Sequence, residues 1–492
     1  DPRRIPGRPA RARGSVRRGL MDPAVVPLLD VSGQWTHRER HQHHPFAMDV
    51  PDGAVELRIR FRWGPQDMGS EHEANGLNLS LFSPDGYRGG AMRGREDQEI
   101  TIGETWATPG CVAGPIPSGV WTINVDAGEI LNDGVDTGFL AYRVEAFARI
   151  GEPGRTRPAD ARSTAPVARG GSSGSAPGWY RGDLHSHTIH SDGDITVADR
   201  VRGAVARGQD FLAITDHNTV SHHREVDAWP DVITPIRGSE VTTFHGHMNC
   251  FGLAEAIDWR DTPRGGGAAR IVEDAHRQGA LISINHPSGF GDPWCGGCHW
   301  DFALVDYATI DAIEVWNGRW RIPESNNNGG LAFWTDLLDA GFRPTAVSGS
   351  DSHSAEEDDY IALPLNHVHA DDRSEASILD GIRRGRVVLS SGPTMTFRAR
   401  GADGREIVLP GERMAAGERV DLEVDVDRLE EPATLWFVTS GSMVALDALA
   451  PGSSRSTRGG LAASKWWRLE LRGGSAANDD VIALTNPVYL TA

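Results

Sequence analysis

The sequence predicts an α/β region in the middle of the chain, with a β-rich region on either side. Short alternating or apolar runs without a helical pattern occupy residues from about 31 to 149. From about 179 to 391, strand-like runs alternate with helix-like runs, and from 392 onward the β pattern returns. Alternating strands and helices imply βα units and a mostly parallel sheet or barrel. The 492 residues are too many for one core, so we expect several domains.

The N-terminal part is expected to be a leader followed by a β-sandwich. Residues 1–30 begin with an Arg- and Pro-rich stretch that lacks the apolar run of a secretory signal. We expect a disordered leader there, or upstream translation before Met21. Within residues 31–150, the runs 55–61 (VELRIRF) and 77–82 (LNLSLF) have the period of half-buried strands, and a turn signal follows at 83–86. Several such strands in succession predict a β-sandwich.

The rest of the chain divides by composition and periodicity. Residues 151–178 are rich in Gly, Pro, Ser, Ala and Arg, which is typical of a linker. Residues 179–391 hold the βα units: helix-like stretches at 196–207, 268–278 and 331–340 and strand-like runs at 211–215, 281–284, 312–316 and 345–348. Residues 392–492 contain further strand-like runs, so we expect a smaller C-terminal β domain.

Charge and hydropathy exclude some classes of function. The net charge of −19 argues against a nucleic-acid-binding protein. No run approaches 18 apolar residues, so no membrane span is expected, and cytoplasmic residence follows by default. Four cysteines do not make a disulfide framework. An anionic substrate stays possible because bound cations can dominate the local field.

Potential metal ligands follow five of the predicted strands in residues 179–391. The C-terminal ends of barrel strands converge on one face, so ligands distant in the sequence come together there. Two His at i and i+2 on an extended segment point to the same side and can reach one ion. The candidates are His185, His187, Asp192, His217, Glu240, either His245 or His247, His286, Asp351 and His353.

The chemistry of these residues narrows the kind of ion. Imidazoles mixed with carboxylates suit Zn, Mn, Fe or Ni better than Mg or Ca. About nine ligands are too many for one ion, so two or three ions with a bridging carboxylate are expected. Such a site can generate a hydroxide at neutral pH, which makes hydrolysis the expected reaction.

The segments DLHSHTIHSDG, ITDHN, GSE, GHMN, NHP and GSDSH resemble the motifs of the polymerase-and-histidinol-phosphatase (PHP) superfamily. The resemblance implies a distorted (β/α)7 barrel with a trinuclear metal site. It implies one ion held by His185, His187, Glu240 and Asp351, and a second held by His217, Glu240, His247 and His286, with Glu240 as the bridge. It favours His247 over His245, because GHMN matches the family pattern. Asp192 and His353 would hold a third ion, although many members have His at the position of Asp192.

A closer resemblance covers nearly everything from about residue 30. The segments ATPG at 107–110, GVW at 119–121, IEVWNG at 313–318, LSSGP at 389–393 and LTNP at 484–487 resemble the carbaryl-hydrolase-like (CehA/McbA) branch. The superfamily implies phosphoester hydrolysis, whereas the branch implies hydrolysis of a carboxylic or carbamate ester. Because function lives in the site and not in the fold, both stay open.

The expected enzyme is therefore a hydrolase that uses a metal-bridging hydroxide, with two or three divalent transition-metal ions (Zn, Mn or Fe). A phosphoester of a small, anionic molecule is the first choice of substrate. Glu240 would bridge the ions, and His217 or His353 would protonate the leaving group. Arg319, just past a strand on the catalytic face, would bind an anionic group of the substrate, or else is a surface arginine. A non-catalytic metal-binding scaffold is the alternative from another class, and the near-complete ligand set argues against it.

A CxxC pair, Cys295 and Cys298, follows His286 and is expected on a loop at the mouth of the site. A single CxxC is a weak signal. Zinc binding, a disulfide and free thiols are the three possibilities, and free thiols are the one that we expect.

Overall fold

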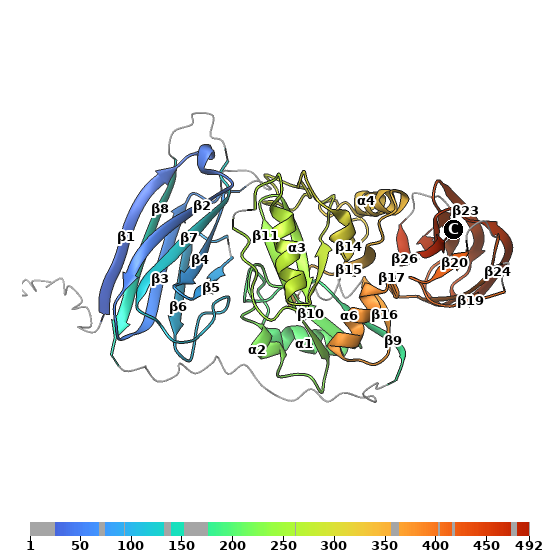
Figure 1. Cartoon of the computed structure of the whole chain (residues 1–492), viewed down its shortest axis with the longest axis horizontal. Helices are drawn as coiled ribbons and strands as arrows, with labels where there is room; N and C mark the ends of the chain where they lie inside the picture. The colour runs from blue at the N-terminus through green and yellow to red at the C-terminus, as the bar shows by residue number, and fades with distance from the viewer. Residues whose placement is uncertain are drawn as a thin grey trace, which may run out of the picture.

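The computed structural model of the chain describes residues 25–67, 74–92, 94–131, 139–151, 176–260, 262–355, 364–401, 404–415, 419–473 and 480–491. Within these residues strands dominate, and the α-helices lie in the central part of the molecule (Figure 1). The predicted linker at 151–178 lies almost entirely outside the described residues, as do the first 24 residues of the predicted leader. No helix of the described part is long and apolar enough to cross a bilayer.

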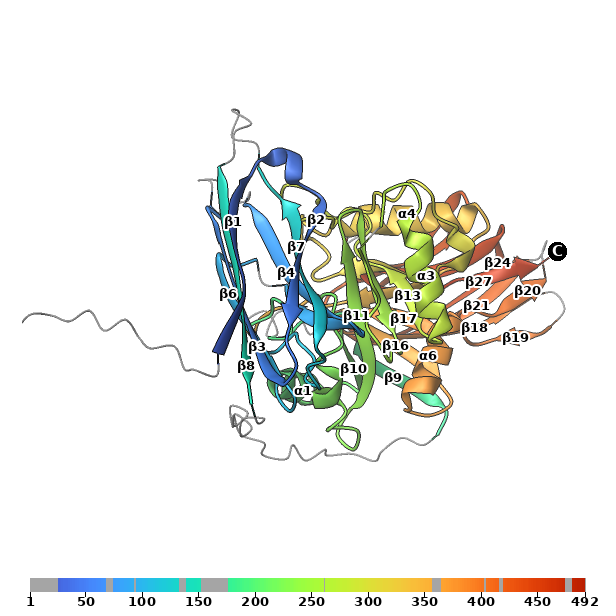
Figure 2. The same cartoon turned by 60° about the vertical axis from the view of Figure 1, so that its left-hand side comes forward.

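The N-terminal part consists of two four-stranded antiparallel sheets that share one core (Figure 2). The first sheet has the order β1 (Val25–Trp35), β8 (Leu140–Ile150), β3 (Ala54–Gly64), β6 (Asp97–Gly103), and the second β2 (Gln42–Val50), β7 (Gly119–Glu129), β4 (Gly76–Ser83), β5 (Gly86–Ala91). A short 3-10 helix, η1 (His37–Glu39), joins β1 to β2. Alternation along β3 buries Leu57, Ile59 and Phe61, because successive side chains of a strand point to opposite faces.

Strand β1 begins at Val25, inside the range 1–30 predicted as a leader. Val25 pairs with Arg149, and the antiparallel register with β8 continues to Trp35. The predicted leader is therefore too long, because pairing with a strand more than a hundred residues away holds residues 25–30 in the sheet.

The central part is built on a sheet that mixes parallel and antiparallel pairs. Strands β9 (Gly178–Asp183), β10 (Phe211–Ile214) and β11 (Thr234–Thr243) are parallel, and so are β13 (Leu281–Ile284), β14 (Ala312–Asn317) and β15 (Thr345–Gly349). Between these two groups, β12 (Gly246–Phe251) runs antiparallel to both of its neighbours. The helices are α1 (Val197–Ala206), α2 (His223–Val226), α3 (Gly267–Arg277), α4 (Asn327–Asp339) and α6 (Glu375–Arg383), with the 3-10 helix η2 (Tyr307–Thr309) before β14.

The described residues do not show the expected (β/α)7 barrel. Two antiparallel strands, β12 and β16 (Leu365–Ala370), interrupt the βα pattern. A closed barrel would also need backbone pairing between β15 and β16. There the side chain of Asn366 instead donates to Ser348 O (2.7 Å) and accepts from Ser348 N (2.9 Å). The structure shows a sheet-rich molecule. Helix and strand patterns in the sequence do not reveal whether two strands pair parallel or antiparallel, so the antiparallel strands were not predicted.

The central sheet also continues into the C-terminal part through β17 (Val387–Ser390), which pairs with β26 (Val481–Thr485). Beyond β26 come β25 (Trp466–Gly473), β22 (Ala433–Thr439) and β23 (Ser442–Leu449), with β27 (Val488–Thr491) and β20 (Arg413–Ala415) off this path. A second sheet has the order β19 (Glu406–Ile407), β18 (Thr394–Arg400), β21 (Arg419–Leu429), β24 (Gly452–Ala462). A core that includes Val424, Phe437 and Trp467 lies between them.

The N-terminal sheets contact the loop that follows β10. The hydroxyl of Tyr87 donates to Asn218 O (2.7 Å), and Thr219 Oγ1 donates to Gly110 O (2.9 Å). Gly110 has a φ of +95°, and a Cβ there would lie 2.8 Å from His190 O of the central part, so only glycine allows this close approach. The contact fixes the backbone directly after His217.

Candidate metal centre

The structure brings all nine predicted ligands into one continuous cluster at the ends of the central strands. His185 and His187 follow β9, His217 follows β10, Glu240 lies in β11, His247 in β12, and His286 follows β13. Asp351 and His353 follow β15, and Asp192 comes from the turn after His187. His245 instead lies near His41 and Phe302 (ring centroids 6.1 and 5.8 Å away), outside this cluster.

Four donor atoms, from His185, His187, Glu240 and Asp351, converge at the buried end of the cluster. His185 Nε2 lies 3.1 Å from His187 Nε2, 3.2 Å from Glu240 Oε2 and 3.1 Å from Asp351 Oδ1. His187 Nε2 lies 3.3 and 3.0 Å from the same two oxygens. Ligands about 2.0–2.2 Å from a tetrahedral ion stand about 3.3–3.6 Å apart. The spacing is therefore close to that of a complete ligand set.

Glu240 separates this group from a second one. Its Oε2 faces His185 and His187 and lies 3.1 Å from His217 Nδ1. Its Oε1 lies 3.2 Å from His247 Nδ1 and 3.4 Å from His286 Nε2, and accepts a hydrogen bond from Asn285 Nδ2 (2.8 Å). Because its two oxygens face two sets of imidazoles, the position suits a bridging carboxylate.

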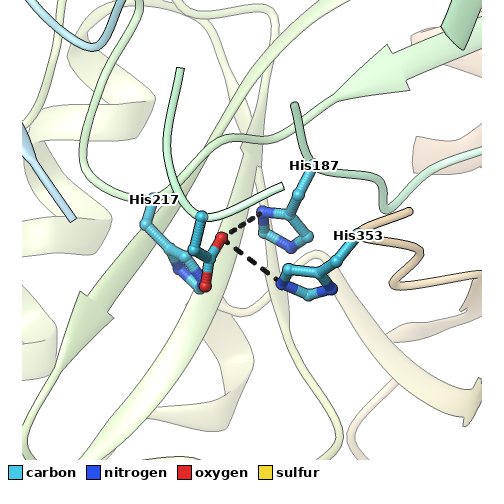
Figure 3. A group of neighbouring side chains, drawn as sticks. His187, His217 and His353 are labelled. Atoms are coloured by element: carbon cyan, nitrogen blue, oxygen red, sulfur yellow. Dashed lines mark ion pairs between the residues drawn. The ribbon is translucent and has the colours of Figure 1, made fainter. Parts of the chain in front are cut away.

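A third group lies on the more exposed side of the cluster. Figure 3 shows the imidazoles of His187, His217 and His353 around a carboxylate. Asp192 Oδ1 lies 3.9 Å from His187 Nδ1 and 3.4 Å from His353 Nε2, and its Oδ2 lies 3.4 Å from His217 Nε2. The side chains of Asp192 and His353 are 35% and 33% exposed, whereas His185 and His187 are fully buried. Solvent therefore reaches the cluster from this side.

The buried carboxylates of the cluster need a cation nearby. Burial alone would raise the pKa of Glu240, but the nearby charges of His185 and His217 hold it well below its usual range. The pKa of Asp351 is likewise held low against burial, mainly by the charge of His185. Both carboxylates are therefore ionised at neutral pH, and a buried anion needs a cation beside it, as a protonated histidine or as a metal ion.

The donor set fits divalent metal ions. His187 Nδ1 is buried, faces Asp192 and makes no hydrogen bond within the described part of the chain. The Nε2 atoms of His185 and His187 face each other and two carboxylate oxygens. These four atoms together offer more lone pairs than hydrogen-bond donors. Neutral imidazoles and carboxylates in this arrangement are typical ligands of first-row transition metals.

Sequence reasoning missed the residues that orient these ligands. Glu314 is 2% exposed, and its Oε1 lies 2.9 Å from His185 Nδ1, while its Oε2 accepts from His286 N (3.0 Å) and Asn317 Nδ2 (3.1 Å). A carboxylate of this kind fixes the tautomer of a ligating imidazole. The available signal was an acidic residue inside the apolar run 312–316.

Arg200 on α1 holds the loops that carry ligands after β9 and β15. Its guanidinium donates to His187 O (2.9 Å), Ser352 O (2.9 Å) and Ser352 Oγ (2.9 Å), so it joins the segments after β9 and β15. The side chain is only 3% exposed. Its signal in the sequence was weak, because an arginine at the core-facing position of a helix looks like an ordinary surface residue.

Arg319, predicted to bind the substrate, lies on the turn after β14 and is exposed. It is therefore not buried with the nine ligands. Asn317, two residues earlier, donates to Asp351 Oδ2 (3.1 Å) and is the polar residue of this strand end that contacts the cluster.

Acidification is expected to destabilise the protein through His223, a buried residue of α2. Its ring nitrogen lies 2.9 Å from Gly238 O, and burial lowers its pKa to about 3. The unfolded chain, with a pKa of about 6.5, binds this proton first as the pH falls. Stability is therefore unchanged above about pH 6.5 and is lost below it, by at most about 1.4 kcal/mol per pH unit, until about pH 3.

Urea unfolding of the metal-free protein at a series of pH values would measure this loss. The His223→Gln variant keeps a donor for Gly238 O but does not titrate, so its free energy of unfolding should fall less steeply below pH 6.5 than that of the wild type. Equal slopes for both proteins would show that His223 is not the group responsible.

Two solved structures show what this chain is similar to. No family model and no curated protein matches the sequence. A two-domain protein from Bacteroides vulgatus, described as containing a predicted PHP-like metal-dependent phosphoesterase, is 19% identical with a TM-score of 0.37, covering 63% of this chain and 96% of its own. An amidohydrolase from Chromobacterium violaceum, solved with bound sulfate and no metal, is 18% identical with a TM-score of 0.24, covering 36% of this chain and 89% of its own. At these levels of similarity the function has to be inferred from the chain's own residues.

Proposed function

We propose that this protein is a metal-dependent hydrolase of the PHP superfamily, in its carbaryl-hydrolase-like branch, with a distorted (β/α)7 barrel as its catalytic part. The observation that carries the proposal is the four-donor set of His185, His187, Glu240 and Asp351, with spacings of 3.0–3.3 Å. We propose hydrolysis of a phosphoester in a small anionic molecule. A cytoplasmic location is part of the same proposal.

The residues would hold two or three ions of Zn, Mn or Fe. His185, His187, Glu240 and Asp351 would hold the first, and His217, Glu240, His247 and His286 the second, with Asp192 and His353 for a third. When bound, such ions polarise a phosphoryl or carbonyl oxygen and lower the pKa of water. The negative charge of the three carboxylates of the cluster repels an anionic substrate, so the ions are also needed for substrate binding.

The chain's own residues would position the substrate and move the proton. The exposed side of the cluster, at Asp192 and His353, is the side that a substrate can approach. Burial would lower the pKa of His353, but the charge of Asp192 raises it to about 10, so its imidazole holds a proton at neutral pH when no cation is beside it. With two ions bound, His353 would protonate the leaving group, because His217 is then a ligand of the second ion. With a third ion bound, His353 would be a ligand instead.

Three chromogenic substrates test the proposal. Protein stripped with a chelator and reloaded with Mn²⁺ or Zn²⁺ is assayed with p-nitrophenyl phosphate, bis-p-nitrophenyl phosphate and 1-naphthyl acetate, and its metal content is measured. We expect phosphoester hydrolysis that depends on metal. Hydrolysis of the naphthyl ester alone would replace the proposed substrate class by the carboxylic or carbamate esters. Metal binding with no turnover would favour the scaffold, and less than about one ion per chain would contradict the multinuclear site.

A further inference from the structure

The loop after β13 places a cysteine beside two of the candidate ligands. The structure joins Cys295 and Cys298 by a disulfide, whereas free thiols were expected from the sequence. The ligand atoms of Cys298, His247 and His286 all lie within 4.8 Å of one another. Cys250 and Cys111, the other two cysteines, are buried and form no disulfide. The CxxC pair therefore differs from the other two cysteines, because it lies beside His247 and His286 of the second group.

The backbone of the same loop orients both imidazoles. Gly296 O lies 3.1 Å from His247 Nε2, and Cys298 O lies 3.1 Å from His286 Nδ1. Carbonyls that accept from these nitrogens leave His247 Nδ1 and His286 Nε2 to face Glu240 Oε1. The loop therefore contacts the second group through two carbonyl oxygens and places a sulfur atom near it.

The loop is held close to the β11–β12 turn. Gly297 has a φ of +77°, and a Cβ there would lie 2.0 Å from Thr243 O, so only glycine fits. Cys295 and Cys298 are nonetheless only partly buried, so a small reductant in solution can reach them. A fixed backbone with an accessible disulfide is suited to a change of ligand without a large movement.

We propose that the CxxC pair is a redox switch on the second metal position, with Cys298 Sγ as a ligand in the reduced state. The inference rests on the proposed function, because it concerns the same centre. A dithiol reductant would exchange with the disulfide, becoming oxidised itself and leaving Cys295 and Cys298 as thiols. Binding of a divalent ion to His247, His286 and Cys298 would then release the Cys298 proton to solvent. In the oxidised state the sulfur is bonded to Cys295 and is not available, because the thiolate is the form that binds metal.

The switch has a consequence for metal choice. Without the sulfur, the second position offers imidazoles and one carboxylate, which accept Mn, Fe or Zn. A thiolate shifts the preference towards zinc, which Cys and His ligands commonly hold together. We therefore expect the reduced protein to select zinc over manganese more strongly than the oxidised protein does.

The two single variants of the pair separate the ligand from the disulfide. Cys295→Ser and Cys298→Ser both abolish the disulfide, but only Cys295→Ser keeps the proposed ligand. Each is loaded with Co²⁺ and examined for a thiolate-to-cobalt charge-transfer band. We expect the band in Cys295→Ser under all conditions and in the wild type only after reduction, and none in Cys298→Ser. Zinc affinity of the reduced wild type should exceed that of Cys298→Ser by about 10–100-fold.

The outcomes distinguish this inference from the proposed function. Cobalt bound to the wild type with no charge-transfer band before or after reduction would overturn the switch and leave the metal centre standing. A band of equal strength in both variants would also overturn it, because the sulfur would not be that of Cys298. No cobalt bound in any state would contradict the proposed function, and the switch with it.

Discussion

The Glu240→Gln variant is expected to lose at least one metal ion per chain and at least about 100-fold in kcat/KM. Glutamine has nearly the same shape but no negative charge, and its amide nitrogen would point a donor at a group of ligands. In the structure both carboxylate oxygens face imidazole nitrogens, at 3.1–3.4 Å. Even residues that only hydrogen-bond to metal ligands are worth about 10–100-fold, so a shared ligand should be worth more.

Elemental analysis and phosphoester kinetics on the same preparation would check this result. Glu431→Gln is the matched control, because Glu431 is exposed on a C-terminal turn and far from the ligands in sequence. It should keep the metal content and the activity of the wild type. Full metal occupancy and full activity in Glu240→Gln would contradict the assignment of Glu240 as the bridge.

The Glu314→Gln variant is expected to bind metal about 10–100-fold more weakly, without replacing any ligand. Glu314 accepts from His286 N and from Asn317 Nδ2 through one oxygen, while its other oxygen faces His185 Nδ1. Both oxygens of Glu314 face hydrogen-bond donors. Glutamine has only one acceptor oxygen, so its amide nitrogen would face a donor, either at His185 or at His286 and Asn317. His185 would then lose the partner that leaves its Nε2 free for metal.

Titration of the stripped protein with Zn²⁺ or Mn²⁺ would measure the change. A positioning role predicts that a large excess of metal restores most of kcat in Glu314→Gln, because every ligand is still present. The same excess should not restore Glu240→Gln. An unchanged metal affinity, with normal folding by circular dichroism, would show that Glu314 does not orient His185.

The candidate ligands were accessible from the sequence because they sit at the ends of strands. Periodicity located the strands before His217, His286 and Asp351, and short motifs such as 185–187 marked further strand ends. Convergence of parallel strand ends then predicted that these residues meet. Arg319 follows a strand end in the same way and yet is exposed, whereas Asn317 at the same strand end contacts Asp351.

The orienting residues were not accessible in this way. Glu314 lies inside β14 and Arg200 on a buried face of α1, and neither position belongs to a motif. Both residues act on partners distant in the sequence: Glu314 Oε1 lies 2.9 Å from His185 Nδ1, and Arg200 donates to Ser352 O at 2.9 Å. The pattern of residues along the sequence does not reveal which distant residues come into contact.

Patterns along the chain were enough to predict part of the strands, the order of the β-rich and α/β regions, and the residues able to bind metal. These depend on local periodicity and on side-chain chemistry, both of which can be read along the chain. Tertiary structure alone decided the antiparallel direction of β12 and β16 and the run of one sheet through β17 into β26. It also decided that the sulfur of Cys298 lies beside His247 and His286. Pairing direction and proximity are set by contacts between segments far apart in the sequence, such as Gly182 and Asn366 in β9 and β16. Backbone hydrogen bonds form with whichever segment the packed chain brings alongside.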